Sequence, residues 1–200
     1  NYNTAVGAFA GKLVTTGVDN TIIGGLAGDA ITTGGNNTVL GKQALSADTK
    51  GGTAVAIGQL ALGAQNFTSA TDNYNVAVGY SAGVGITTGV QNTIIGGLAG
   101  DALTDADKNV AVGRSALTSD TLGSMSTAIG YSALDNQNFT SATNSRNTAV
   151  GHTAGISVTT GKDNTLIGEQ AGYYITTGSK NTILGRHTGN AGGVDIRTAS

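Results

Sequence analysis

Residues 20–30 read NTIIGGLAGDA, and the same eleven letters return at residues 92–102. The stretch begins with a five-residue motif that recurs along the chain: Asn, then Thr or Val, an apolar residue, a branched aliphatic residue and Gly. The motif ends at Gly7, Gly24, Gly41, Gly58, Gly79, Gly96, Gly113, Gly130, Gly151, Gly168 and Gly185. A repeat of fixed period sets the architecture of a whole chain, so this motif decides the fold.

The spacing of the motif has two levels. Successive motif glycines follow a period of 17, with two exceptions of 21, which hold the insert QNFTSAT at 65–71 and 137–143. Four successive units form a larger block, so that the opening NYN at 1–3 returns at 73–75. The expected organisation is a repeat array over 1–189, made of super-repeats 1–72, 73–144 and 145–189, followed by a divergent segment at 190–200.

Each 17-residue unit predicts one coil of a solenoid. Residues 3–7 (NTAVG) are short and rich in β-branched residues, which is typical of a strand that ends at a Gly corner. Residues 14–17 (VTTG) predict a second strand and a second corner. So much Gly and so many β-branched residues disfavour helix. The predicted fold class is therefore all-β, a β-solenoid (β-helix or β-roll) of 17-residue coils in a 72-residue super-repeat.

Two strand columns are apolar in every unit. The fourth motif position is always a branched aliphatic residue, as in Val6 and Ile23, and we expect it to face the core. Side chains alternate along a strand, so the third position should face the other way. A strand that is apolar on both faces is buried on both faces, which predicts a homo-oligomer with its strands near the axis. The predicted subunit-interface residues are Ala5, Ile22, Val39, Ala56, Ala77, Ile94, Ala111, Ala128, Ala149, Leu166 and Ile183.

Two further columns predict how the coils pack. Where Gly28 follows the Ala of its unit, Ile31 comes three places later, whereas Leu45 in the next unit is followed by Asp48. One large side chain per coil thus fills one slot, as close packing requires. Asn also opens nine of the eleven motifs, with Ala54 and Ser126 as the exceptions. Stacked Asn side chains are typical of a hydrogen-bonded ladder.

The inserts are the candidate binding loops. They extend every fourth coil at the same corner, and at ~4.8 Å per stacked strand they would stand roughly 19 Å apart. An aromatic ring beside amides and hydroxyls suits a sugar, and loops on rigid scaffolds often hold binding residues. The alternative is that each Phe folds back to cover the corner or a subunit seam. The candidate ligand contacts are Asn66, Phe67, Thr68, Asn138, Phe139 and Thr140.

Composition and motifs exclude several other classes. Lys and Arg number 10 against 12 Asp and Glu, so the chain lacks the basic footprint of a nucleic-acid binder. It has no Cys, and no apolar run approaches the ~20 residues of a membrane span. Asp105 and Asp107 lack the downstream Glu of a calcium loop, and His152 and His187 lie at non-equivalent positions. We therefore expect no catalytic, cofactor or metal residues, no enzyme activity and no membrane insertion.

The units at 3–11 (NTAVGAFAG) and 75–83 (NVAVGYSAG) resemble the repeats of phage tail-fibre and bacterial surface proteins that end in an intramolecular chaperone of the endosialidase type. They are also similar to the head repeats of trimeric autotransporter adhesins, although those units are shorter. The resemblance covers about residues 1–189 and implies a trimeric fibre, extracellular or on a virion. The sequence shows no chaperone domain, so we expect a piece of a longer protein.

The resulting functional expectation is an adhesive shaft that presents a host- or surface-binding end, with a cell-surface glycan as a second partner. The alternative is a self-assembling extracellular filament subunit, in which open coil ends stack head to tail. A third hypothesis is an ice-binding solenoid, because pairs such as Thr15–Thr16 and Thr32–Thr33 recur in register. That array is broken in other coils, for example at Thr49–Lys50, which spoils a regular lattice.

Overall fold

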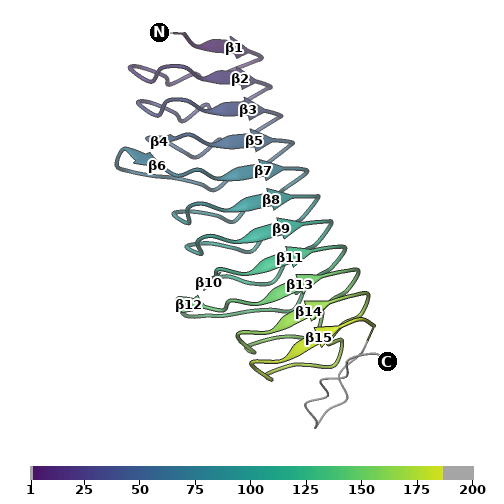
Figure 1. Ribbon diagram of the computed structural model, residues 1–200. Coiled ribbons are helices and arrows are strands. Elements are labelled where there is room, and N and C mark those ends of the chain that lie inside the picture. Colours follow the sequence, from purple (N-terminus) through teal and green to yellow (C-terminus); the bar gives the residue numbers. More distant parts are fainter. Residues whose placement is uncertain (1, 187–200) are drawn as a thin grey trace.

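The computed structural model describes residues 2–186, which form an elongated stack of coils (Figure 1). Eleven three-residue strands, one per coil, make a parallel sheet along the stack. They are β1 (Thr4–Val6), β2 (Thr21–Ile23), β3 (Thr38–Leu40), β5 (Val55–Ile57), β7 (Val76–Val78), β8 (Thr93–Ile95), β9 (Val110–Val112), β11 (Thr127–Ile129), β13 (Thr148–Val150), β14 (Thr165–Ile167) and β15 (Thr182–Leu184). The predicted all-β solenoid of 17-residue coils is confirmed. The divergent segment expected at 190–200 lies outside the described residues.

The sequence period becomes the register of this sheet. Thr21 pairs with Thr38, its equivalent one coil later, and Val55 pairs with Val76 across the first insert. Each insert adds a short parallel pair at the corner where the chain enters the large sheet. These pairs are β4 (Gly51–Gly52) with β6 (Thr71–Asp72), and β10 (Gly123–Ser124) with β12 (Thr143–Asn144). The inserts therefore lengthen a coil without shifting the register of the large sheet.

The predicted assignment of the two strand faces is wrong. The third motif position points into the coil, where Ile22 and Val39 are at most 1% exposed, whereas the fourth position points outward, where Leu40 is 44% exposed. Ala5 of the first coil is exposed, and the other predicted subunit-interface residues are buried inside their own chain. These buried residues are Ile22, Val39, Ala56, Ala77, Ile94, Ala111, Ala128, Ala149, Leu166 and Ile183.

The physical reason is the parity of the strand. Asn20, which opens its motif, is buried in the coil, and side chains alternate along a strand. Ile22 must therefore share the inward face of Asn20, while Thr21 and Ile23 share the outward face. The third position therefore faces the interior of the coil. The fourth position, which is also apolar, faces outward and has no partner within the chain.

The prediction of a second strand in each coil, at 14–17 in the first coil, is also wrong, because the chain bends at that place. The amides of Thr15, Thr16 and Gly17 all donate to the carbonyl of Thr32 in the next coil, at 2.9, 3.3 and 3.2 Å. Three consecutive amides converge on one carbonyl only when the backbone curves around it. The segment contacts the neighbouring coil as a strand would, but it turns a corner at the same place.

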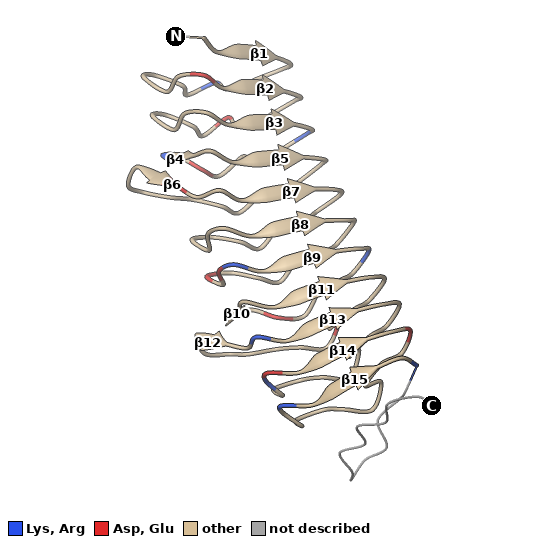
Figure 2. Cartoon of the chain, viewed as in Figure 1, with Lys and Arg blue, Asp and Glu red and all other residues tan. Residues whose placement is uncertain are grey.

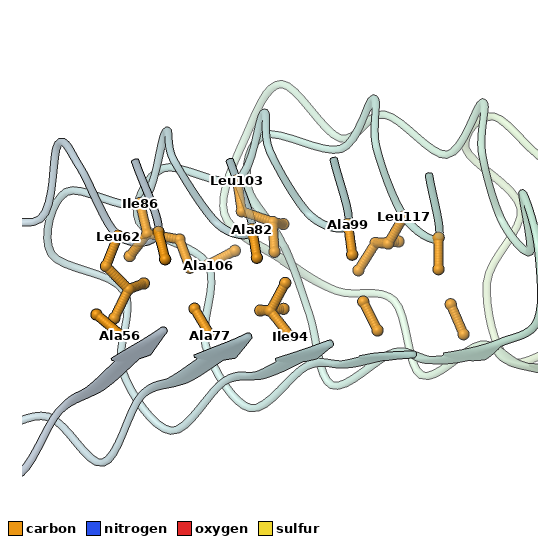
Figure 3. Packing of buried hydrophobic residues seen from close by; sticks show 14 of the residues in the cluster. Ala56, Leu62, Ala77, Ala82, Ile86, Ile94, Ala99, Leu103, Ala106 and Leu117 are labelled. Atoms are coloured by element: carbon orange, nitrogen blue, oxygen red, sulfur yellow. The ribbon is translucent and has the colours of Figure 1, made fainter. Parts of the chain in front are cut away.

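The core is a continuous column inside the coils (Figure 3). In Figure 3, Ala77 and Ile94 point inward from the strands toward Ile86 and Leu103 on the opposite wall. The slot inferred from the sequence is confirmed, because a Cβ on Gly100 would lie 2.9 Å from the Cδ1 of Leu103. In coils of the other type Leu residues are fully buried instead, as at Leu45. Each coil thus contributes one large side chain to this slot.

The Asn residues form the predicted ladder. The Asn20 side chain accepts a hydrogen bond from the Asn37 amide of the next coil at 3.0 Å, and its Nδ2 donates to the carbonyl of Gly34 at 3.0 Å. Asn92 and Asn109 repeat the arrangement at 3.0 Å. Each buried amide therefore satisfies backbone groups that the corner would leave without partners. The ladder ties successive coils together from the inside, up to the coils in which Ala54 and Ser126 replace the Asn.

The motif glycines make close backbone contacts between coils. Gly113 has a φ of +131°, and a Cβ on it would lie 2.5 Å from the carbonyl oxygen of Gly130 in the next coil. That atom belongs to the backbone and cannot move aside without separating the coils. The column therefore accepts Gly alone.

We expect Gly113→Ala to lower the free energy of unfolding by about 2–3 kcal/mol, because it adds both backbone strain and a clash between coils. Gly97→Ala is the matched control, since its nearest neighbour, the Tyr80 carbonyl oxygen, would lie 4.0 Å away. The control should stay within about 0.5 kcal/mol of the parent. Urea unfolding followed by circular dichroism measures both, and equal midpoints for the two variants would contradict this packing.

Candidate functional site

One surface is defined by the second and fourth motif positions, which point outward from every strand of the large sheet; we name it the outer sheet face. In the described strands these positions hold Thr, Val, Ile or Leu and no charged residue, and Figure 2 shows the charges at the corners instead. Leu40, Ile95 and Ile129 expose 44, 39 and 38% of their surface. The face therefore carries one aliphatic column, at the fourth position, beside a column that is mostly Thr; it holds no charge and is unpaired within the chain.

The outer sheet face is a long exposed strip. At ~4.8 Å per strand and ~3.3 Å per residue, eleven strands give a face roughly 50 Å long and 10 Å wide. The threonines of the second position cover part of this area of roughly 500 Å², and the aliphatic side chains form a continuous apolar column beside them; apolar patches of a few hundred Å² on monomers are often functional. Every coil contributes to it in the same way, so the face is a continuous strip.

The insert corners do not offer the aromatic rings that a sugar would stack on. Phe67 and Phe139 are each only 6% exposed, so the rings fold back and cover the corner. The other four candidate contacts, Asn66, Thr68, Asn138 and Thr140, lie exposed at the surface. From the sequence, each Phe could either contact a ligand or fold back to cover its corner. The burial of both rings favours the second possibility.

A buried carboxylate holds each insert in place, and sequence reasoning missed it. The Oδ1 of Asp48 accepts hydrogen bonds from the amides of Gly51 and Phe67, at 3.0 and 3.1 Å. Its Oδ2 accepts one from the side-chain amide of Gln65 at 2.7 Å. The Gln65 oxygen in turn accepts a hydrogen bond from the Asn75 side chain at 2.9 Å, which restarts the Asn ladder in the next block.

The second block repeats this network. The Asp120 carboxylate accepts hydrogen bonds from the amides of Gly123 and Phe139, both at 3.0 Å, and from the Gln137 side chain. A signal was present in the sequence, because in both blocks the Gln that opens the insert follows an Asp by one full period of the repeat. The carboxylates are structural groups that close the corner, with no exposed surface for a substrate.

The first threonine of a Thr–Thr pair uses its hydroxyl group internally. Thr15 and Thr32 each donate a side-chain hydrogen bond to a carbonyl of the next coil at 3.0 Å, and Thr159 does so at 3.2 Å. A hydroxyl donated to the backbone is not free to donate to surface water. This bonding weighs against a water-ordering role for the column.

An exposed ladder of unlike side chains runs down one corner from the second super-repeat into the third. The Tyr131 and His152 rings stack with centroids 5.3 Å apart and planes 11° apart. The Arg114 guanidinium lies 5.8 Å from the Tyr131 centroid on the other side. The rings face one another along the stack and so do not present their faces to a ligand.

Other acidic groups of residues 2–186 contact their own neighbours in the stack. Asp105 accepts a hydrogen bond from Thr88 at 2.6 Å, and Asp107 accepts one from the amide of Val90 at 2.8 Å. At the surface, a hydrogen bond from Arg146 lowers the pKa of Asp163 below its ordinary value. Residues 2–186 hold no group of three His, Asp or Glu side chains placed to bind a metal ion. His187 lies outside the described residues.

Comparison with known proteins adds no family to this description. No protein-family model, no curated protein and no solved structure matches the chain. In the described part of the chain, no helix is long and apolar enough to cross a membrane. The surfaces that could serve a function are the outer sheet face, the insert corners and a recess beside the first insert.

We expect Asp120→Ala to destabilise the fold by about 3 kcal/mol, because two backbone amides and the Gln137 amide lose their acceptor inside the protein. Hydrogen exchange over residues 137–143 should quicken in the same variant. Asp135→Ala is the control, since the Asp135 side chain makes no hydrogen bond in the described chain, and it should change stability by about 0.5 kcal/mol or less. Unfolding in urea compares the two, and an unaltered midpoint for Asp120→Ala would refute the structural role of the carboxylate.

Proposed function

We propose that the chain is the shaft of an extracellular or virion fibre, built from identical copies that pack through their outer sheet faces. The observation that carries the proposal is the outer sheet face itself, an uncharged strip that continues over all eleven strands. The shaft is mechanical: it holds a host- or surface-binding end away from the particle or cell, and it adds contacts of its own to surface glycans.

The partner on the outer sheet face is a second copy of the same chain. Apolar side chains such as Ile95 and Ile129 repeat at the spacing of stacked strands over the whole length of the solenoid. A partner that matched them along this length would need the same rise per rung, and an identical chain has it. Packing two such faces removes apolar area from water without placing a charge in the interface.

Three copies are proposed because of the resemblance of the units to trimeric fibre repeats. The elongated form also supports a shaft. The stability of such a stack is the sum of contacts between neighbouring coils, so the stack can be long. The filament alternative makes a different prediction for mass in solution. The ice-binding alternative is disfavoured because the Thr15 column donates its hydroxyls to carbonyls of the next coil.

We expect the parent protein to have three times the mass of one chain by light scattering, independent of concentration. Ile95→Lys should reduce this to the mass of one chain, because it brings a charge into a face that association dehydrates. The circular dichroism spectrum should not change, since the side chain is already 39% exposed within the single coil.

Gln91→Lys is the matched control, because Gln91 is exposed and lies off the outer sheet face, and Lys108 occupies the equivalent position one coil later. This variant should keep the oligomer. A parent protein of single-chain mass would overturn the shaft, and a ladder of masses that grows with concentration would favour the filament subunit.

A further inference from the structure

A recess of about 200 Å³ opens beside the first insert, and we propose that it binds one neutral sugar residue through neighbouring hydroxyl groups. It spans three coils: the turn at 33–36, Lys50 with Gly52, and residues 70–72 at the end of the insert. This corner, near the labels β4 and β6 in Figure 1, is separate from the outer sheet face. The inference deepens the attachment role proposed above and rests on it for its biological setting, but the site is built by one chain.

Two glycines line the recess. A Cβ on Gly52 would lie 2.9 Å from the Gly35 carbonyl oxygen and 3.1 Å from the Oδ1 of Asp72, so Gly52 is the position where a side chain would enter it, whereas a Cβ on Gly35 would face Val18 of the preceding coil. In the second block the equivalent positions are Asp107 and Ser124. There the Ser124 hydroxyl accepts a hydrogen bond from the Asp107 amide at 3.0 Å and so occupies the corner, while the Asp107 carboxylate accepts one from the Val90 amide of the preceding coil at 2.8 Å. The two insert corners therefore differ most at Gly52, where the second block carries the side chain of Ser124.

The rim carries three polar groups that make no hydrogen bond or ion pair within the described chain. They are the ammonium of Lys50, the carboxylate of Asp72 and the amide of Asn36, and all three residues are exposed. Asp72 leans over the floor, since a Cβ built on Gly52 would lie 3.1 Å from its Oδ1. The only ion pair among residues 2–186 is elsewhere, between Arg146 and Asp163. The recess therefore offers a donor, an acceptor and a group that does both.

This set of groups selects among ligand classes. One lysine opposite one aspartate leaves no net charge to attract an anion or a cation. With Ala70 as its one apolar lining side chain, the recess has no surface for an aromatic or aliphatic ligand. The Asn36 amide and the Asp72 carboxylate line the recess from its first and third coils and can donate to and accept from sugar hydroxyls, and the Lys50 ammonium between them can donate to a further oxygen. The volume is below the roughly 300–1,000 Å³ of drug-sized pockets, so it takes about one sugar ring.

The second block supplies a natural comparison. Lys50 corresponds to Leu122, Asp72 to Asn144 and Asn36 to Lys108, so the second corner lacks a carboxylate and an ammonium at the places where the first has them. The second corner carries its charges at Asp107 and Lys108 instead. The double variant Lys50→Leu, Asp72→Asn gives the first corner residues that the fold already accepts at the second.

The test is titration of the ¹⁵N-labelled full chain with the methyl glycosides of glucose, galactose and mannose, followed by amide chemical shifts. We expect at least one of the three to shift the amides of Gly35 and Gly52, with a Kd of about a millimolar, as suits a few exposed hydrogen bonds. The Lys50→Leu, Asp72→Asn variant should bind at least about tenfold more weakly, because each sugar hydroxyl loses a charged partner. Asn144→Asp is the control in the second block and should leave the Kd unchanged.

Shifts confined to the recess and lost in the double variant support the site. No shift with any of the three glycosides overturns it, and so do shifts that lie elsewhere or survive the double variant. Light scattering on the same samples separates this result from the fibre proposal. An oligomer without sugar binding refutes only the recess, and sugar binding by a single chain refutes only the shaft.

Discussion

Each residue of this protein has to stack on its equivalent in the next coil, and the rest of the structure depends on that constraint. The coils approach so closely at the corners that Gly113 leaves no room for a Cβ beside Gly130. Inside the coil, the Asn20 side chain bonds to the amide of Asn37, so a buried polar group in one rung completes the backbone of the next. Because every contact of this kind joins neighbours, stability accumulates along the stack, and no large central core is needed.

The same constraint shapes the surfaces. A side chain that points outward in one coil points outward in all of them, so one apolar column becomes a strip along the whole molecule, and this strip supports association of copies. The inserts are the exception to uniformity. They need the buried Asp48 and Asp120 to close their corners, and they create positions where the two blocks differ, such as Gly35 against Asp107. Columns that are the same in every coil are suited to the association of copies. Positions that differ between the two blocks are suited to the recognition of a ligand.

Much of this could be predicted from the sequence, and the failures have physical causes. The period of 17 predicted the solenoid and its register, and the exchange between Gly28 with Ile31 and Leu45 predicted the interior slot. The sequence prediction assigned the inward and outward faces of the strand the wrong way round, because both carry apolar residues. The inward Asn20 lies two residues before the third position, so the alternation of side chains would have given the correct assignment. The second strand failed because three amides converge on the Thr32 carbonyl, which no propensity reveals. The recess was not predictable, since the residues that line it come from three coils that only folding brings together.

The rise of the coils is the most direct test of the account. The chain contains no Cys, so Thr16→Cys and Thr160→Cys introduce two spin labels at equivalent exposed positions, eight coils apart. Electron–electron distance measurement, with labelled protein diluted in unlabelled protein, should give a narrow distribution near about 38 Å, which is eight steps of stacked strands. A broad distribution, or one centred well beyond that distance, would contradict the stacking of one coil on the next.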